Sequence, residues 1–170
     1  EIVALIARRQ PVASDLRVAV VDPVPDLLEL AAVPVGGGLA VLWRGKTEWN
    51  STSNVWFARL AAEAAEPPAG DAALLPGVLA AHPQANPPRR TFAVAPADGG
   101  FVAAWAFRDP PAAGDGAGLR LASFRDDGTP VGAPLTLDTD RQLARDPVLL
   151  RAGAGREHWF AFVLGEPGAD

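Results

Sequence analysis

The chain has 170 residues and a mass of 17.6 kDa, with 49% hydrophobic and 21% charged residues, which suits one globular domain with a hydrophobic core and excludes a disordered chain. Its net charge of −5 and its single Lys beside fourteen Arg residues exclude the basic field that nucleic acid or an anionic membrane would attract. No apolar run is long enough for a membrane-spanning helix, and the absence of Cys excludes disulfides and cysteine-based sites.

The first 25 residues contain two short apolar runs. The segment 2–6 (IVALI) is similar to the second strand of the segments described next, and the segment 16–21 (LRVAVV) is similar to a third strand. We therefore expect residues 1–25 to form a truncated copy of a repeated unit. Because the sequence starts at Glu1 without a methionine or a signal peptide, we expect a processed product or a fragment.

Three later segments share one pattern, in which an apolar run, a Gly-rich turn and a second apolar run with an aromatic end follow one another. They read DLLELAAVPVGGGLAVLW (26–43), RTFAVAPADGGFVAAW (90–105) and DPVLLRAGAGREHWFAFV (146–163). Gly in these turns tolerates the positive φ that a tight hairpin requires. The pattern predicts three β-hairpins.

The second strands of the first two hairpins are apolar on both faces. In LAVLW (39–43) and FVAAW (101–105), successive residues point to opposite faces and all of them are apolar. A strand of this kind lies between two packed layers. Trp43 and Trp105 end these strands, so we expect both side chains in the core.

A third strand is expected after each of these hairpins, at 54–60 (NVWFARL) and at 118–124 (GLRLASF). The second of them leads into Asp127-Gly128, a strong hairpin signal, and then into a fourth strand near 134–137. The stretch 61–90 is rich in Ala and Pro and has no such pattern. We expect it to be a loop, with one or two helical turns at 58–66 before Pro67-Pro68.

The copies GGGLAVLW and DGGFVAAW, with RLASFRDDGTPVGAPLTL after the second, resemble the GGFVxAW-type repeats of bacterial secreted or lipid-anchored surface proteins. The resemblance covers most of residues 26–163 and implies β-propeller blades. The third copy departs from it, with Arg156-Glu157-His158 where Gly-Phe is expected. The resemblance also implies an extracellular, periplasmic or cell-surface location in a bacterium.

The expected fold class is all-β, with antiparallel four-stranded blade-like repeats that form a partial or incomplete β-propeller. Three copies are too few, because a closed propeller needs at least about four blades. An irregular β-sandwich is the alternative. The single repeat domain, 1–170, divides into a truncated copy (1–25), a copy with the atypical insert 61–90 (26–89), a further copy (90–145) and a partial copy (146–170).

Residues for catalysis or metal binding are scarce. The two histidines, His82 and His158, have no zinc-ligand spacing, and the Asp residues sit in turn sequences, where Asp is common for structural reasons. His158 is aligned with Leu39 and Phe101, which predicts a packed or rim imidazole. We expect no enzyme activity, no cofactor and no metal, with calcium at GDGAG (114–118) or DTD (138–140) as the weaker alternative.

The expected function is a noncatalytic surface or secreted scaffold that mediates protein–protein interaction or assembly, with a further chain completing the propeller. A carbohydrate-binding or carbohydrate-active propeller is one alternative, and a fragment without a separate function is another. The candidate binding residues lie in polar loops: Trp49, Asp109 and Asp115. Carboxylates that converge beside an exposed Trp would favour a glycan, whereas a flat apolar edge near the chain ends would favour assembly.

Overall fold

The computed structural model describes residues 2–7, 16–21, 27–45, 52–61, 73–81, 90–108, 116–139, 144–152 and 157–164. The regular elements in these ranges are all strands, and no helix long and apolar enough to cross a membrane occurs among them. The strands are β1 (Ile2–Ala7), β2 (Leu16–Val21), β3 (Leu27–Val35), β4 (Gly38–Gly45), β5 (Thr52–Ala61), β6 (Ala73–Ala81), β7 (Phe92–Ala97), β8 (Gly100–Arg108), β9 (Ala117–Arg125), β10 (Pro130–Asp138), β11 (Ala144–Arg151) and β12 (His158–Leu164).

The strands form four antiparallel sheets, none of which closes on itself. Two sheets have four strands in sequence order, β3-β4-β5-β6 and β7-β8-β9-β10, and two sheets have two strands, β1-β2 and β11-β12. The prediction of an all-β protein built from antiparallel sheets is confirmed. Each sheet is a local meander, because every strand pairs with the strand that follows it in the sequence.

Two-residue turns close the first two predicted hairpins. Val35 pairs with Gly38 across Gly36-Gly37, and Ala97 pairs with Gly100 across Asp98-Gly99. Gly37 and Gly99 have φ angles of 71° and 72°, a conformation that Gly adopts without the steric penalty of a Cβ atom. These glycines explain why the chain reverses direction at both turns. The third predicted turn, GAG (153–155), lies outside the described residues.

The predicted hairpin at Asp127-Gly128 is confirmed. The Gly128 amide donates to the Arg125 carbonyl at 2.9 Å, and the Thr129 amide donates to Asp127 Oδ1 at 2.8 Å. A side chain that caps its own turn in this way is the reason that Asp is common in turns. The fourth strand is longer than predicted, because β10 begins at Pro130.

The prediction of a loop over 61–90 is wrong, because β6 lies within it and pairs with β5. Pro76-Gly77 indicated a loop, but both residues fall in the register shift opposite Asn54 and Trp56. A bulge of this kind on an edge strand accommodates Pro, which has no amide to donate. The helical turns predicted from residue 58 are also wrong over 58–61, which belong to β5; residues 62–66 lie outside the described residues.

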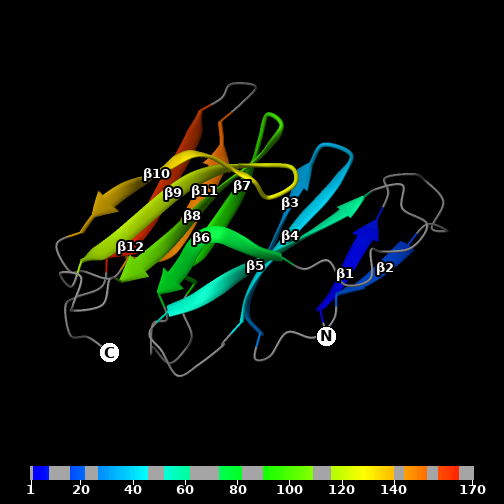
Figure 1. Ribbon diagram of the computed structural model, residues 1–170, viewed down its shortest axis with the longest axis horizontal. Helices are drawn as coiled ribbons and strands as arrows, with labels where there is room; N and C mark the ends of the chain where they lie inside the picture. Colours follow the sequence, from blue (N-terminus) through cyan, green and yellow to red (C-terminus); the bar gives the residue numbers. More distant parts are fainter. Residues whose placement is uncertain are drawn as a thin grey trace.

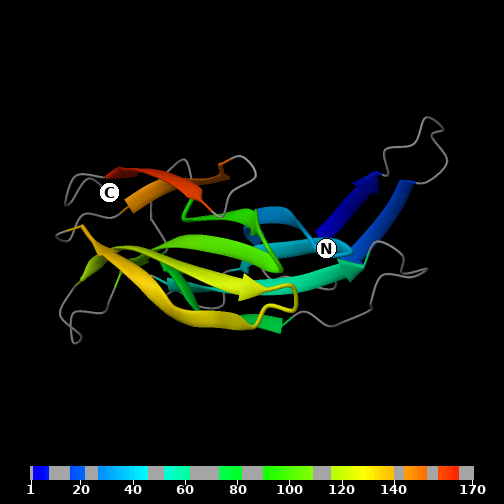
Figure 2. The same ribbon diagram turned by 90° about the horizontal axis from the view of Figure 1, so that it is seen from above.

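Three sheets stack in a row, in the order β3–β6, β7–β10 and β11–β12 (Figures 1 and 2). The main core lies between the first two, where the Phe101 ring stacks on Phe57 at 5.7 Å and on Phe124 at 5.3 Å between ring centroids. A smaller core, which includes Ala104 and Leu149, lies between the second and third sheets. Aromatic rings therefore dominate the first interface, and small residues on β8 receive larger ones from β11 and β12 at the second.

Strand β8, the second strand of the β7–β8 hairpin, is buried on both faces, as its sequence predicts. Phe101, Ala103 and Trp105 pack against the β3–β6 sheet, whereas Ala104 and Ala106 on the opposite face pack toward β11 and β12. Trp43 and Trp105 are each buried, so their prediction as core residues is confirmed.

The stacking is head to tail, because β7–β10 and β11–β12 each pack against the preceding sheet with the equivalent face. Trp105 on β8 faces the preceding sheet β3–β6, and the aligned Phe162 on β12 faces the preceding sheet β7–β10. Ala40 and Leu42 on β4 face the following sheet instead. We call the side toward the following sheet the outgoing face and the side toward the preceding sheet the incoming face.

Candidate functional sites

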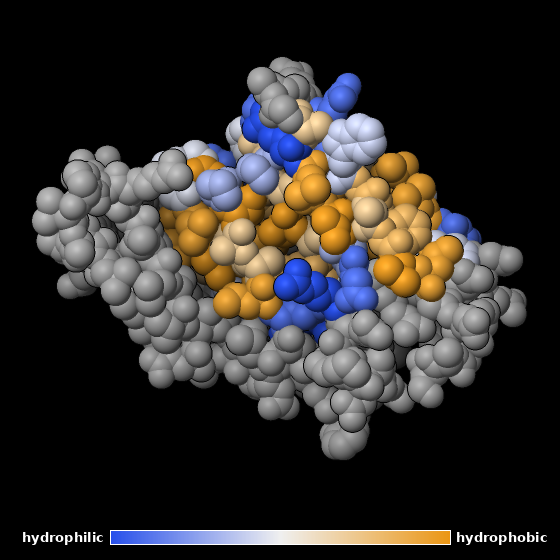
Figure 3. All heavy atoms as spheres, turned by 180° about the vertical axis from the view of Figure 1, so that it is seen from behind, coloured by the Kyte–Doolittle hydropathy of each residue, from blue (hydrophilic) through white to orange (hydrophobic). Residues whose placement is uncertain are grey.

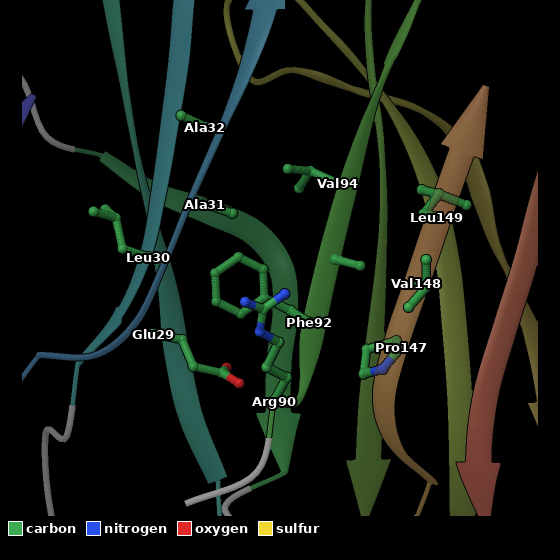
Figure 4. A pocket seen from close by; sticks show the side chains of 11 residues that line it. Glu29, Leu30, Ala31, Ala32, Arg90, Phe92, Val94, Pro147, Val148 and Leu149 are labelled. Atoms are coloured by element: carbon green, nitrogen blue, oxygen red, sulfur yellow. The ribbon is translucent and has the colours of Figure 1, made fainter. Parts of the chain in front are cut away.

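A cleft of about 500 Å³ lies where the first strands of the three stacked sheets meet. It is lined from β3, β7 and β11, by Glu29, Leu30, Ala31, Ala32, Arg90, Phe92, Ala93, Val94, Pro147, Val148 and Leu149 (Figure 4). Most of these side chains are apolar. The polar groups gather at one end of the cleft, where the Glu29 carboxylate and the Arg90 side chain lie near each other (Figure 4).

Glu29 is the centre of a polar cluster that joins two sheets. Its carboxylate accepts hydrogen bonds from the backbone amide of Thr91 and from Thr91 Oγ1, the latter at 2.8 Å. Arg44 Nε lies 3.0 Å from Glu29 Oε2, and the Arg44 side chain is only 1% exposed. Arg44 comes from β4 in the same sheet, and Thr91 immediately precedes β7 in the next one. The cluster therefore holds the start of β7 against β3.

Burial shifts the pKa values of the two charged groups of this cluster, Glu29 and Arg44, in opposite directions. Desolvation raises the pKa of Glu29, although the positive charge of Arg44 and the hydrogen bonds from Thr91 act to lower it. Desolvation likewise lowers the pKa of Arg44, against the influence of Glu29. A buried ion pair recovers its desolvation cost only when further hydrogen bonds complete it. Thr91 supplies such bonds, which indicates a structural role for the cluster.

Arg90, which precedes β7, and Asp146 on β11 exchange two hydrogen bonds beside the cleft. The Asp146 amide donates to the Arg90 carbonyl at 2.9 Å, and Asp146 Oδ1 accepts from the Arg90 amide at 3.2 Å. Asp146 has a φ of 48° and sits in the register shift of β11. Asp tolerates this left-handed conformation better than most residues. The exchange orients the Arg90 backbone at the mouth of the cleft.

The chemistry that the cleft offers is limited. Glu29 is the one carboxylate among its described lining residues, and it is already paired with Arg44 and Thr91. Glycoside hydrolysis uses two carboxyl groups that flank the scissile bond. Within the described ranges, no group of three potential metal-ligating side chains occurs. The described part of the cleft therefore contains neither a pair of carboxyl groups nor a group of three metal-ligating side chains.

A second cavity of about 500 Å³ lies near the β7–β8 turn, between β7–β10 and β11–β12. Arg151 Nη2 contacts Asp98 Oδ1 at 2.5 Å across its edge, and His158 Nε2 lies 3.0 Å from the Pro96 carbonyl. His158 is half-buried at this rim, so the prediction of a packed or rim imidazole is confirmed. These contacts link the second and third sheets at the rim.

The outgoing face of β11–β12 is apolar and exposed. It consists of Val148, Leu150, Trp159, Ala161 and Val163, and the Trp159 and Leu150 side chains are 70% and 61% exposed. From behind, hydrophobic residues gather over much of the described surface (Figure 3). Monomeric soluble proteins seldom leave such residues in one contiguous patch.

The binding residues predicted from the sequence, Trp49, Asp109 and Asp115, lie outside the described residues, as does His82. The calcium candidate at 114–118 is described only from residue 116 onward, and that at 138–140 only through Thr139.

Sequence reasoning did not identify Glu29, Arg44 or Trp159. Glu29 and Arg44 are charged residues within apolar strands, and such a residue signals a buried pair when its partner lies on the neighbouring strand. Trp159 stands at the strand position of Ala40 and Val102, when Trp43, Trp105 and Phe162 are aligned. A large aromatic residue at a position where the other copies have small ones was the available signal.

No protein-family model, curated protein or solved structure matches this chain.

Proposed function

We propose that the protein is a noncatalytic β-propeller-like scaffold that mediates protein–protein assembly. The observation that carries the proposal is the exposed apolar outgoing face of β11–β12, in which Trp159 is 70% exposed. An apolar face of this kind favours assembly over a glycan site, because the other residues described on this face, Val148, Leu150, Ala161 and Val163, are aliphatic.

The propeller-like arrangement is supported by the repeated packing. Two four-stranded meanders and a two-stranded sheet follow one another, and the second and third of them each place the incoming face against the sheet before. Radial stacking of four-stranded meanders is the construction principle of a propeller. Among the described residues, no sheet follows the outgoing face of β11–β12, and this is where a partner would complete the assembly.

Comparison of equivalent positions supports an assembly role for the exposed face. Leu150 and Trp159 pair with each other, as do Val33 with Ala40 and Ala95 with Val102 in the two preceding sheets. Val33 is 2% and Ala40 is 0% exposed, because the next sheet covers them. Where a further sheet follows, three of these four residues are therefore buried and Val102 is partly buried, and the stabilisation amounts to roughly 25 cal/mol per Å² of apolar surface removed from water.

The proposal is tested by light scattering of the chain in an extract of its source cells, with Trp159→Glu and Leu135→Glu as matched variants. Leu135 is 60% exposed but lies on the edge strand β10. We expect the wild-type chain and Leu135→Glu to be found in an assembly, and Trp159→Glu to be lost from it. The proposal fails if all three chains stay at the mass of a monomer, or if Trp159→Glu assembles as well as the wild type.

A further inference from the structure

The cleft between β3, β7 and β11 has a cationic group at its polar end. Figure 4 shows the Arg90 side chain projecting into the cleft between Glu29 and Pro147. Arg90 is exposed, and its two hydrogen bonds with Asp146 involve only its backbone amide and carbonyl. Among the described residues, no hydrogen bond or ion pair involves the Arg90 guanidinium. This group can therefore bind an anion without giving up a partner within the described chain.

The other charged groups near this end already have partners. Glu29 accepts a hydrogen bond from Thr91 Oγ1 and lies 3.0 Å from Arg44 Nε. The Asp146 carboxylate accepts from the Arg90 amide and does not line the cleft. One unmatched positive charge suits a carboxylate, because a phosphate group carries about −1.5 to −2. A guanidinium also matches the planar geometry of a carboxylate, which it binds through two parallel hydrogen bonds.

The walls beyond the polar end suit apolar side chains. Ala31, Ala93 and Val94 line the cleft and are only partly buried, so they retain surface for a ligand. The volume of about 500 Å³ lies within the range of roughly 300–1,000 Å³ that is usual for ligand sites with apolar walls and a few polar groups. The cleft therefore has room for a short segment with small or aliphatic side chains.

The cleft is also bounded by the edges of strands. Within the described ranges, β3, β7 and β11 each pair with one strand only, which is β4, β8 and β12 respectively. The lining includes the consecutive residues 29–32, 92–94 and 147–149. Because successive residues of a strand point to opposite faces, a cavity lined by consecutive residues is bounded by the strand edge, where backbone amide and carbonyl groups lie. A hydrocarbon ligand would leave these groups without hydrogen bonds, whereas a peptide can pair with them.

We infer that this cleft binds the carboxyl terminus of a partner polypeptide whose last residues are apolar. The terminal carboxylate pairs with Arg90, the apolar side chains lie against Ala31, Ala93 and Val94, and the peptide backbone pairs with a strand edge. Capture of a terminal carboxylate and addition of an extended peptide to a sheet edge are both known modes of recognition. The site is separate from Trp159, so the inference goes beyond the proposed function and does not depend on it.

The test is a binding measurement in which the terminal charge of a peptide is removed by itself. The probe is acetyl-Ala-Val-Leu with a free carboxyl terminus, and its control is the same peptide with a terminal amide. Isothermal titration calorimetry is carried out on the purified 170-residue chain. We expect the carboxylate peptide to bind at least about tenfold more tightly, because a hydrogen bond to a charged group contributes enough for such a factor. Equal affinity for the two peptides, or binding of neither, overturns the inference.

The Arg90→Gln variant assigns the preference to one side chain. We expect its affinity for the carboxylate peptide to fall to that for the amide peptide, and its affinity for the amide peptide to stay unchanged. The two proteins and two peptides form a double-mutant cycle, which isolates the contact between the guanidinium and the carboxylate. A preference for the carboxylate that survives in Arg90→Gln overturns the inference.

Arg125→Gln is the matched control. Arg125 is also an exposed arginine, but it lies at the end of β9 and does not line this cleft. We expect this variant to bind both peptides as the wild type does. Near-ultraviolet circular dichroism of both variants checks that the fold is retained. An equal loss of the preference in Arg125→Gln and Arg90→Gln would mean that net charge, not the cleft, attracts the peptide, which overturns the inference.

Amide NMR spectra show where the peptide lies. The expected chemical-shift changes are at residues 29–32, 91–94 and 148–149, around the cleft. The indole N–H of Trp159 reports separately on the exposed outgoing face. Changes at Trp159 without changes around the cleft would mean that the apolar peptide binds to that face, which overturns the inference. Such a result leaves the proposed assembly through Trp159 standing, and a chain that does not assemble leaves peptide binding by the cleft standing.

Discussion

Thr91 holds Glu29 across the boundary between two sheets that share no backbone pairing. Its backbone amide and its Oγ1 atom both donate to the Glu29 carboxylate, the hydroxyl at 2.8 Å, and Arg44 approaches the same carboxylate from the neighbouring strand. The apolar stacking of the sheets thus contains a polar contact with defined geometry. Because a buried polar group is costly when it is misplaced, this contact favours one alignment of the sheets.

Glu29→Gln should change how stability depends on pH. Burial raises the pKa of Glu29 above its ordinary value of 4.5. The folded state therefore favours the protonated carboxyl group, and ionisation of this group removes its contribution to stability. Its contribution is fully present below the unfolded-state pKa and is lost as the pH rises through the higher pKa of the folded state. We expect the stability of the wild type relative to Glu29→Gln to fall as the pH rises from about 4.5.

Urea denaturation of both proteins between about pH 4 and pH 8 measures this difference. Thr91→Val serves as the control, because it removes the hydroxyl donor and retains the backbone donor and the carboxyl group. A stability advantage of the wild type that grows with pH would contradict the raised pKa and would mean that Arg44 outweighs desolvation.

Gly99→Ala should destabilise the protein more than Gly99→Asn does. Gly99 has a φ of 72° with no atom within 4 Å of an added Cβ, so the cost comes from the backbone conformation alone. The left-handed conformation costs roughly 1–2 kcal/mol for a residue such as Ala and less for Asn. Thermal and urea unfolding of both variants give the comparison. Equal losses would show that something other than φ limits this position.

Phe101→Ala should be among the most damaging single substitutions in the protein. The side chain is fully buried, and its ring stacks on rings from the facing sheet and from its own sheet, Phe57 and Phe124. Removal of a buried Phe side chain costs about 3–5 kcal/mol. Urea denaturation measures this loss, and Leu135→Ala, at an exposed site, should change stability by less than about 0.5 kcal/mol. Similar losses for both variants would contradict the assigned core.

Asp127 should titrate below its ordinary pKa of 3.8. The Thr129 backbone amide donates to its carboxylate and stabilises the charged form, which lowers the pKa. The sign means that this contribution to stability is present above the unfolded-state pKa and is lost as the pH falls. Carbon-detected NMR titration of the folded protein and of the protein in urea measures both values. A folded-state pKa at or above the value in urea would contradict the turn geometry.

Local sequence patterns were sufficient to predict the first three strands and the hairpin turns of the two copies that carry GGGLAVLW and DGGFVAAW. Gly at the turn positions and apolar residues on both faces of the second strands reflect physics that acts within a few residues, so β4, β8 and their hairpins follow directly. The strand β6 was missed for the same reason. Pro76-Gly77 is a local loop signal, and only pairing with β5 shows that a bulge accommodates it.

The sequence by itself determined the all-β class, the hairpins and the burial of Trp43 and Trp105, because periodicity and turn chemistry are local properties. Only the tertiary structure decided which faces meet. Alternation tells that Trp159 and Phe162 point to opposite sides of β12, but not which side the preceding sheet covers. The meeting of Glu29 with Thr91, 62 residues apart, and the exposure of Trp159 depend on the order in which whole sheets stack, which no local pattern encodes.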